Sequence, residues 1–395
     1  MFTTTWKKIL RREITYRYTL KKNYFIYYNK ATCLFHSTPS NDDNNNNNNN
    51  NNKSTDFSIV NKLPTFFHHY TPSNVSQNTT NNRIITILGG IHGNELVGVE
   101  IIKWLQGILS SSPPSLFHNM TGELMIGLGN PNAINLNKRA TSNQEDLNRC
   151  FTTVSEETTK NDLNNLSYEK QRALEIRPIL NATSILIDIH ATNKPSPPFI
   201  RIAGNKFTED HKRVINYFSN SNIILRDINY TIGNGLISTT DEFVGNNNKN
   251  GIGICYEVGQ ASDMSCMNNV KKEIKLFLEK EMNLILPEKI NVDKEDDNHS
   301  SNKTTTTIIY EMMHAINLPN GHRFEWANNN DNNVNIGDEN FEFVPANQDI
   351  GYMYNLTTNE QTKIISYPFD CYLVFPKVEE LMVEGKPVVW VAKES

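Results

Sequence analysis

RIITILGGIHGNE, the segment Arg83–Glu95, joins a β-branched apolar run to two glycines and then to a polar turn that contains His92. The stretch that follows, Glu95–Leu109, has apolar residues at helical spacing. The segment therefore predicts a buried strand, a sharp turn that glycine permits, and a helix. Ligands of open α/β sheets bind beyond the carboxyl ends of the strands, so we expect a functional site at this turn.

Strand and helix patterns alternate from this segment to about residue 290, which predicts an α/β fold with a mostly parallel sheet and flanking helices. After residue 290 the short strand-like runs are separated by turn residues without a helix between them, which predicts a smaller, β-rich C-terminal domain. The strands are expected at Glu123–Leu128, Ser184–Ile189, Phe199–Ile202, Ile223–Arg226, Gly253–Val258, Ile308–Ile316, Phe341–Val344, Ile350–Tyr354, Lys363–Ser366, Tyr372–Phe375 and Pro387–Ala392, and further helices at Tyr168–Leu180, His211–Phe218 and Val270–Leu286.

The N-terminal part of the 395-residue chain differs from the rest in composition. Residues 1–40 are basic, rich in hydroxyl groups and nearly free of acids, which is typical of a mitochondrial transit peptide or of a disordered basic tail. Residues 41–80 form an Asn-rich linker with an unbroken run at Asn44–Asn52, and we expect it to be largely disordered. The remaining chain divides into an α/β domain at 81–290 and the β-rich domain at 291–395.

Overall composition excludes several classes of protein. The net charge of −5 does not favour a nucleic-acid partner, and no apolar run reaches the roughly 18 residues of a membrane-spanning helix. The five cysteines are odd in number and form no C-x-x-C pair, so neither a disulfide framework nor a thiolate zinc site is expected. Any metal should therefore be held by histidine and carboxylate.

Three residues at predicted strand ends suit such a metal. His92 and Glu95 lie three positions apart in the turn, and His190 ends the apolar run that begins at Ile185. Two histidines and one carboxylate are a common set of ligands for catalytic zinc. Asp188, two residues before His190 and on the same side of the strand, could support that ligand. A lone histidine is more often structural, but that interpretation weakens when two histidines and a glutamate fall at matching strand ends.

Glu257 is a carboxylate in a strand otherwise suited to burial, Gly253–Val258. Such a group could take a proton from an attacking water and pass it to a leaving nitrogen. Its alternative role is a strand-end salt bridge.

Three polar residues between the predicted strands suit substrate binding. Arg149 offers a planar fork for a carboxylate, and Asn148 can bind beside it. Arg139 could polarise a scissile carbonyl. Either arginine, taken alone, would more simply be a surface residue.

In five motifs the chain resembles the aspartoacylase and succinylglutamate desuccinylase family of zinc-dependent amidohydrolases, which are relatives of zinc carboxypeptidases. The resemblance extends from about Arg83 to Lys393. Each motif is weak alone, but the five together, in this order and spacing, are specific. They are Gly90-Ile91-His92-Gly93-Asn94-Glu95, Gly129-Asn130-Pro131 through Lys138-Arg139, Asp146-Leu147-Asn148-Arg149, Asp188-Ile189-His190 and Tyr256-Glu257-Val258-Gly259.

The resemblance implies a zinc carboxypeptidase-like fold in which residues 81–290 are the catalytic zinc hydrolase domain and the C-terminal β domain shapes the entrance to the site. It implies one Zn²⁺ per subunit. The roles that it implies are zinc ligands at His92, Glu95 and His190, a general acid/base at Glu257, a carbonyl-polarising Arg139, and a clamp on the substrate α-carboxylate at Asn148 and Arg149.

The sequence departs from the animal aspartoacylases at two positions that bind substrate there. Asp241 falls where an arginine binds the side-chain carboxylate of the substrate, and Leu381 falls where a tyrosine contributes. Both departures concern substrate binding, and the residues of the hydrolytic core are all present. From their proximity to His190, Lys194 or Arg201 could replace the missing cation.

These features predict a zinc-dependent hydrolase of N-acyl amino acids, with N-acetylaspartate as the first choice of substrate. N-succinylglutamate or another N-acyl amino acid is the alternative, followed by a peptide-cleaving carboxypeptidase and by a non-catalytic relative that binds a metabolite. We expect a small-molecule N-acyl amino acid substrate, no nucleic-acid or membrane partner, and a homodimer as a possible assembly. The expected location is the cytoplasm, with the mitochondrion as the alternative because of residues 1–40.

Overall fold

The computed structural model describes residues 63–73, 83–141, 145–151, 165–204, 207–218, 221–227, 244–245, 251–287, 307–329 and 334–395. The basic segment 1–40 and most of the Asn-rich segment 41–80 lie outside the described residues. The elements are β1 (Phe67–Tyr70), β2 (Ile84–Gly89), α2 (Leu96–Ser111), η2 (Pro114–Phe117), β3 (Glu123–Leu128), α3 (Pro131–Leu136), η3 (Leu147–Arg149), α5 (Tyr168–Ala182), β4 (Ile185–Thr192), β5 (Phe199–Ala203), α6 (Glu209–Ile215), β6 (Ile223–Asp227), β7 (Ile252–Gln260), α7 (Met267–Met282), β8 (Ile308–Asn317), β9 (His322–Trp326), β10 (Asn328–Asn329), β11 (Val334–Asn335), β12 (Glu342–Val344), β13 (Asp349–Asn355), β14 (Gln361–Ser366), β15 (Cys371–Val374), η5 (Glu379–Leu381) and β16 (Pro387–Glu394).

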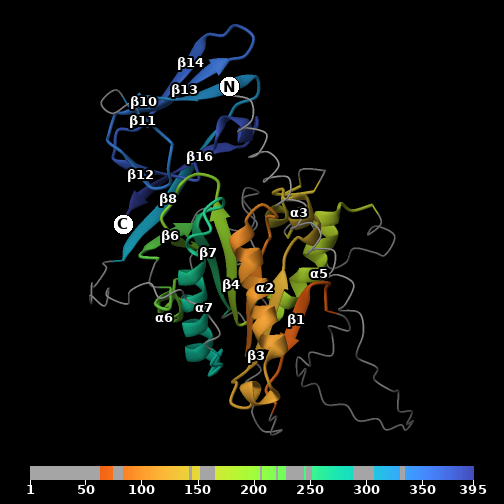
Figure 1. Cartoon of the computed structure of the whole chain (residues 1–395). Helices are drawn as coiled ribbons and strands as arrows, with labels where there is room; N and C mark the ends of the chain where they lie inside the picture. The colour runs from red at the N-terminus through yellow and green to blue at the C-terminus, as the bar shows by residue number, and fades with distance from the viewer. Residues whose placement is uncertain are drawn as a thin grey trace, which may run out of the picture. The chain divides into compact units, whose positions relative to one another are not determined.

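One mixed sheet of eleven strands runs through this part of the chain, in the order β1-β3-β2-β4-β7-β5-β6-β8-β16-β15-β12 (Figure 1). Strands β3, β2, β4 and β7 are parallel to one another, whereas β1 and β5 run antiparallel to β3 and β7. The predicted α/β fold with a mixed sheet and flanking helices is confirmed, and parallel pairing prevails among the central strands but not in the sheet as a whole. The parallel strands bring the carboxyl ends of β2, β4 and β7 to the same edge of the sheet.

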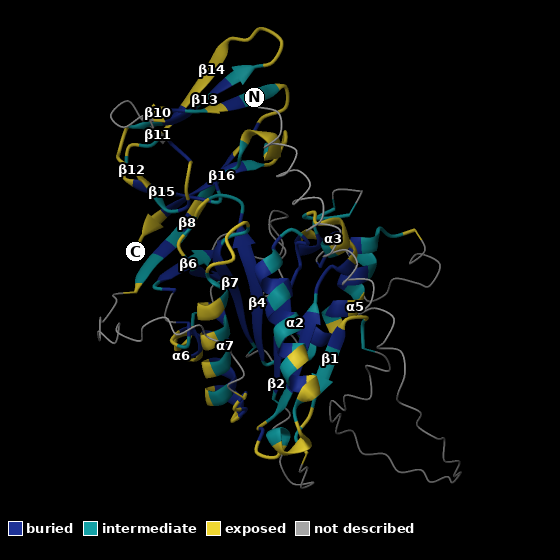
Figure 2. Cartoon of the chain, viewed as in Figure 1, coloured by how far each residue is buried: buried dark blue, intermediate teal, exposed yellow. Residues whose placement is uncertain are grey.

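The central strands are buried on both faces because helices cover them (Figure 2). Helix α2 packs against β2, β3 and β4 and against α7. The resulting core consists mainly of isoleucine and leucine from the strands, with aromatic side chains such as Phe277 on α7 and Phe218 packed against it. Burial on both faces explains why these strands are continuous apolar runs in the sequence rather than alternating ones.

The C-terminal strands continue the main sheet instead of starting a separate one. Strand β8 pairs in parallel with β6, and β16, β15 and β12 follow as antiparallel neighbours. A three-stranded sheet of β14, β13 and β9 and the hairpin β10–β11 complete this β-rich part, which has its own small core. The residues after about 290 are therefore joined by backbone hydrogen bonds to the α/β part.

Most predicted elements occur within a few residues of their expected positions, but some short ones were missed. Strand β1 lies inside the predicted linker 41–80, and helix α3 begins at Pro131 in a motif where no helix is predicted. Helix α3 is six residues long and is set by local chemistry, because the Asn130 side chain accepts a hydrogen bond from the Ala133 amide and Pro131 occupies the first turn. Such short elements carry little periodicity.

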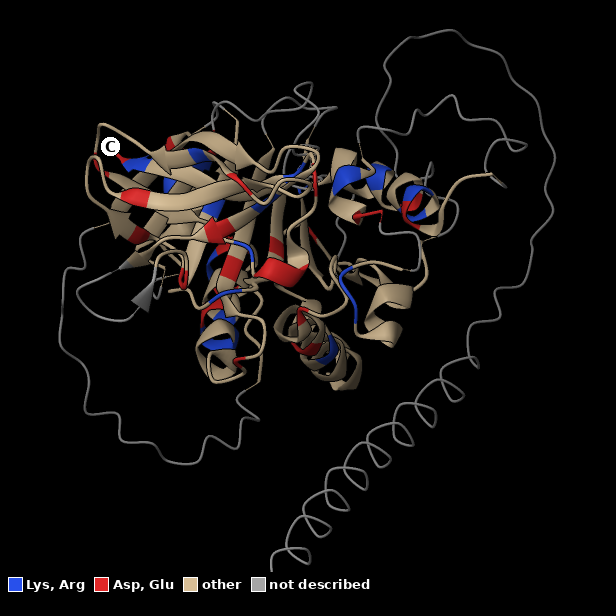
Figure 3. Ribbon diagram, turned by 90° about the horizontal axis from the view of Figure 1, so that it is seen from above, with Lys and Arg blue, Asp and Glu red and all other residues tan. Residues whose placement is uncertain are grey.

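Acidic and basic residues are interspersed over the described elements (Figure 3). Among the described helices, none is both long and apolar enough to cross a membrane.

Arg172 on α5 donates hydrogen bonds to the backbone just before β1 and at the end of β3. Its side chain is 1% exposed and donates to the carbonyl oxygens of Gly129 (2.8 Å), Leu128 (2.8 Å) and Thr65 (2.9 Å). It also pairs with Glu175 at 2.6 Å. A buried guanidinium is tolerated here because its donors are largely used.

Replacing Arg172 with Met should lower the free energy of unfolding by about 3 kcal/mol, because buried carbonyl groups would lose charged donors. Urea denaturation followed by circular dichroism measures this change. Lys103→Met is the matched control, since the pair of Lys103 with Glu100 is partly exposed and should contribute about 0.5 kcal/mol or less. Equal stability of the two variants would contradict the anchoring role of Arg172.

Candidate active site

Adjacent strands bring the site residues together. Strand β4 pairs with β7 so that His190 and Glu257 are direct neighbours, and β2 pairs with β4 so that Gly89 lies beside Ile189. The turn after β2 therefore begins next to His190. The register of three parallel strands is enough to place His92, Glu95, His190 and Glu257 around one point.

The turn after β2 needs glycine for two different reasons. Gly90 has a φ of 69°, which non-glycine residues rarely adopt. Gly89 lies against α2 so closely that an added Cβ would be 2.3 Å from the carbonyl oxygen of Gly98. The close approach brings the first residue of the helix to the end of the sheet. Glu95 is the N-cap residue of α2, but its carboxylate makes no capping bond and is turned toward the histidines.

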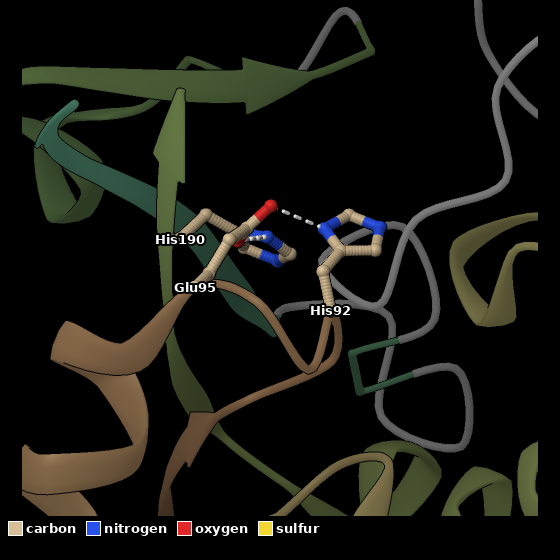
Figure 4. Close-up of side chains that lie close together, drawn as sticks. All are labelled: His92, Glu95 and His190. Carbon is tan, nitrogen blue, oxygen red and sulfur yellow. Dashed lines mark hydrogen bonds and ion pairs between the residues drawn. The ribbon is translucent and has the colours of Figure 1, made fainter. Parts of the chain in front are cut away.

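The Glu95 carboxylate lies between two imidazoles (Figure 4). One oxygen is 2.7 Å from Nδ1 of His92, and the other is 3.0 Å from Nδ1 of His190 and accepts from the Ala191 amide at 3.1 Å. The three side chains are buried, and each offers a ligand atom within 4.8 Å of the others. Burial alone would raise the pKa of the Glu95 carboxyl, but the two histidines outweigh it and lower that pKa.

Each imidazole has an aspartate behind it. Asp188 Oδ2 lies 3.0 Å from Nε2 of His190, and Asp146 Oδ1 lies 3.0 Å from Nε2 of His92. Burial opposes protonation of His190, but Asp188 and Glu95 together raise its pKa well above the usual value. The aspartates leave both Nδ1 atoms directed at Glu95, which is the arrangement that a metal bound by Nδ1 requires.

Glu257 lies in the same cavity and is 7% exposed. Its Oε2 atom is buried and makes no hydrogen bond with any described residue, while Oε1 is 3.9 Å from Sγ of Cys255. Burial is the main reason that the pKa of this carboxyl rises to about 7. A carboxyl with such a pKa can both accept and donate a proton near neutral pH.

Asp146 links the arginine residues to the histidine cluster. Its carboxylate accepts from Arg139 Nη2 at 2.8 Å and from the Asn148 amide at 2.9 Å, besides its contact with His92. Burial would raise the pKa of Asp146, but Arg139 and His92 hold it well below its usual value. Arg139 also lies 3.6 Å from the Glu95 carboxylate. Asp146 belongs to one of the five motifs, but the sequence predicts no role for it.

The turn that carries Arg139 is held by a buried glutamate on α5. Glu169 accepts from the Thr141 amide at 2.7 Å, from its hydroxyl at 2.9 Å and from Asn130 Nδ2 at 3.4 Å. Helix α5 also contacts η3, which carries Asn148 and Arg149. Arg139 and Arg149 are thus positioned by α5 rather than by the sheet.

All seven predicted site residues line one cavity, together with residues that the sequence analysis did not select. The β-rich C-terminal part supplies one side of this cavity, as the resemblance implied. The additional lining residues include Cys255 and, from the C-terminal part, Asn340, Phe375, Pro376, Lys377 and Trp390.

Of the two positions at which the chain departs from animal aspartoacylases, the structure describes only Leu381. Asp241 lies outside the described residues. Leu381 lies in η5 and is 46% exposed, and it is not among the described residues that line the cavity. Lys194 and Arg201, the suggested substitutes for the missing cation, both line the cavity.

Comparison with known proteins relates the chain that forms this cavity to one protein family. Residues 81–278, half of the chain, match the family described as "Succinylglutamate desuccinylase/Aspartoacylase catalytic domain". A probable aspartoacylase of Nostoc sp. is 36% identical over 113 residues, 27% of this chain and 35% of that protein. An N-acyl-aromatic-L-amino acid amidohydrolase (carboxylate-forming) of Xenopus tropicalis is 32% identical over 131 residues, 31% of this chain and 38% of that protein. The chain thus aligns with little more than a third of the length of these relatives.

Solved structures share the fold over a longer span. The succinylglutamate desuccinylase of Vibrio parahaemolyticus superposes with a TM-score of 0.56 at 16% identity, covering 83% of this chain and 86% of that one. Murine aminoacylase 3 superposes with a TM-score of 0.52 at 16% identity, covering 80% of this chain and 96% of that one. With the match over residues 81–278, the chain belongs to the succinylglutamate desuccinylase/aspartoacylase family.

Proposed function

We propose that the protein is a zinc-dependent amidohydrolase that releases a carboxylic acid and a free amino acid from an N-acyl amino acid. The observation that carries this proposal is the cluster of His92, Glu95 and His190 beside Glu257, whose Oε2 atom has no hydrogen-bond partner among the described residues. Family membership supports the reaction class. The reaction needs a carbonyl-polarising group, a proton carrier and an anion clamp, and the cavity contains a candidate for each.

The cluster suits one zinc ion per chain. Two imidazole nitrogens and a carboxylate are a frequent ligand set of catalytic zinc, and both Nδ1 atoms point toward Glu95. Zinc, when bound, would act as a Lewis acid and favour ionisation of water near neutral pH. Asp188 and Asp146 would keep the imidazoles oriented for the ion.

The side chains around the cluster divide the remaining tasks. Glu257 would accept a proton from the attacking water and then donate it to the departing amine, for which a pKa of about 7 is suitable. Arg139 would stabilise the negative charge that develops on the carbonyl oxygen. Asn148 and Arg149 would bind the α-carboxylate and hold the amide bond beside Glu257.

N-acetylaspartate is our first choice of substrate, and N-succinylglutamate or another N-acyl amino acid is the alternative. The relatives support this range of substrates, since the matched proteins include probable aspartoacylases and an N-acyl-aromatic-L-amino acid amidohydrolase. Basic side chains line the cavity, which favours an anionic substrate.

Replacing Asp188 with Asn should weaken zinc binding about 10- to 100-fold, because the carboxylate that orients His190 would lose its charge. Competition with a chromophoric chelator measures the dissociation constant. Asp338→Asn is the control, since Asp338 pairs with a lysine and is half exposed. If both variants bind zinc like the unaltered protein, Asp188 does not support a metal ligand.

Replacing Glu257 with Gln should leave one zinc per chain and lower kcat about 100- to 10,000-fold, because the amide cannot carry the proton. Metal analysis and an assay for released amine provide the two readouts. Glu279→Gln, at a position on α7 where the side chain is 44% exposed, should change neither. Retained turnover in the Glu257 variant would remove that residue from the mechanism.

A substrate panel tests the function itself. Zinc-loaded protein should release amine from N-acetylaspartate faster than from N-succinylglutamate, from N-acetylated apolar amino acids and from a short peptide. Preference for another N-acyl amino acid would keep the reaction and change the substrate. Preference for the peptide would indicate a carboxypeptidase, and no turnover of any compound with zinc bound would contradict hydrolysis of this class.

A further inference from the structure

The cavity contains more basic side chains than it has acids to pair with them. Three of the five basic residues have a carboxylate partner. Arg201 pairs with the buried Asp227, and Lys194 lies 3.3 Å from Asp338. The third, Arg139, is paired with Asp146, as described above. The remaining two basic residues that line the cavity are Arg149 and Lys377.

Within the described part of the chain, neither Arg149 nor Lys377 forms an ion pair. The Arg149 guanidinium donates to the backbone carbonyl of Asn148 at 3.3 Å. The Lys377 ammonium has neither a hydrogen bond nor an ion pair with a described residue, although the residue is half-buried. Cations that are partly withdrawn from water without a counter-charge are costly, so two such groups facing one cavity favour an anionic ligand with more than one charge.

Backbone contacts fix the position of Lys377. Its amide donates to the Val388 carbonyl at 2.8 Å, and its own carbonyl accepts from Trp326 Nε1 at 3.3 Å. Two residues earlier, the amide of Phe375 donates to Asn340 Oδ1 at 2.7 Å, and Phe375 has a φ of 54°. A non-glycine residue in this conformation needs support from its surroundings.

Asn340 also connects this segment to the loop after β4. Its amide donates to the Pro195 carbonyl at 2.9 Å, and its Nδ2 atom is 3.4 Å from the same oxygen. The loop after His190 and the segment 375–377 are thus held together at the cavity. An ammonium on such a fixed segment loses little further backbone freedom when it binds a ligand.

The neighbours of Lys377 show that it lies close to the reaction centre. Burial lowers the pKa of its ammonium to about 8, and Arg139 and Arg149 contribute to the decrease. The group therefore remains mostly protonated at neutral pH. A ligand carboxylate placed among these cations would reduce their mutual repulsion.

We infer that Lys377 binds a second carboxylate of the substrate, other than the α-carboxylate assigned to Arg149, and so selects N-acyl derivatives of acidic amino acids. This inference rests on the proposed function. It replaces the earlier suggestion that Lys194 or Arg201 supplies the missing cation, because each of these already has a carboxylate partner. Lys377 is far from His190 in the sequence and reaches the cavity only through the C-terminal strands.

The test compares N-acetylaspartate with N-acetylasparagine, which has the same shape without the second charge. In the zinc-loaded full chain, Lys377→Met should lower kcat/KM for N-acetylaspartate about 30-fold or more, as expected when a charged partner in a cavity is lost. The value for N-acetylasparagine should change less than about threefold. Lys377→Arg should recover part of the loss, and the control Lys194→Met should leave the ratio of the two substrates unchanged.

Binding is measured separately by calorimetric titration of both compounds into the Glu257→Gln protein, with and without Lys377→Met. Binding of N-acetylaspartate should weaken by a similar factor, whereas binding of N-acetylasparagine should not. Equal losses for both compounds, no loss for either, or preference of the unaltered protein for N-acetylasparagine would overturn the assignment. Lys377-dependent binding of N-acetylaspartate without turnover would preserve the assignment and contradict the proposed hydrolysis.

Discussion

The Glu95 carboxylate, held between the Nδ1 atoms of His92 and His190, is the interaction on which the arrangement of the site depends. Burying a carboxylate is costly unless hydrogen bonds or opposite charges stabilise it. Here two imidazoles and the Ala191 amide contact the Glu95 carboxylate. The two imidazoles are stabilised in the same way, because each also contacts an aspartate through its Nε2 atom. Glu95 is the N-cap residue of α2, but its side chain contacts the histidines instead of capping the helix. The N-terminus of α2 therefore lacks a stabilising side-chain hydrogen bond.

The core of this site could be predicted because its residues are fixed by strand ends. An apolar run that stops at a polar residue locates His190 within the fold, and parallel pairing then places Glu257 beside it. The same reasoning placed His92 and Glu95 in the turn after β2. The fold class was predictable for a related reason, since strands buried on both faces are visible as apolar runs.

The rest of the site could not be predicted from local pattern. Lys377 and Asn340 lie in connections between strands of the β-rich part, and they meet the cavity because β8 pairs with β6 and extends the main sheet. Nothing in the spacing of a sequence fixes such a pairing between distant segments. The ion-pair partners of charged residues cannot be predicted from spacing either. Asp227 pairs with Arg201 on the adjacent strand, and this contact follows only from the pairing of β5 with β6.

This division gives the two parts of the chain different roles in the proposed reaction. Strands β2, β4 and β7 provide the groups that would hold zinc and move protons, and their geometry follows from the parallel register. The β-rich part provides Lys377 on a segment whose backbone is fixed by Val388 and by Asn340. Changes in that segment could alter the charge presented to the substrate without disturbing the register of the central strands. On this argument, differences in substrate among family members need not involve the residues nearest the proposed metal site, because the β-rich part can supply a cation to the same cavity.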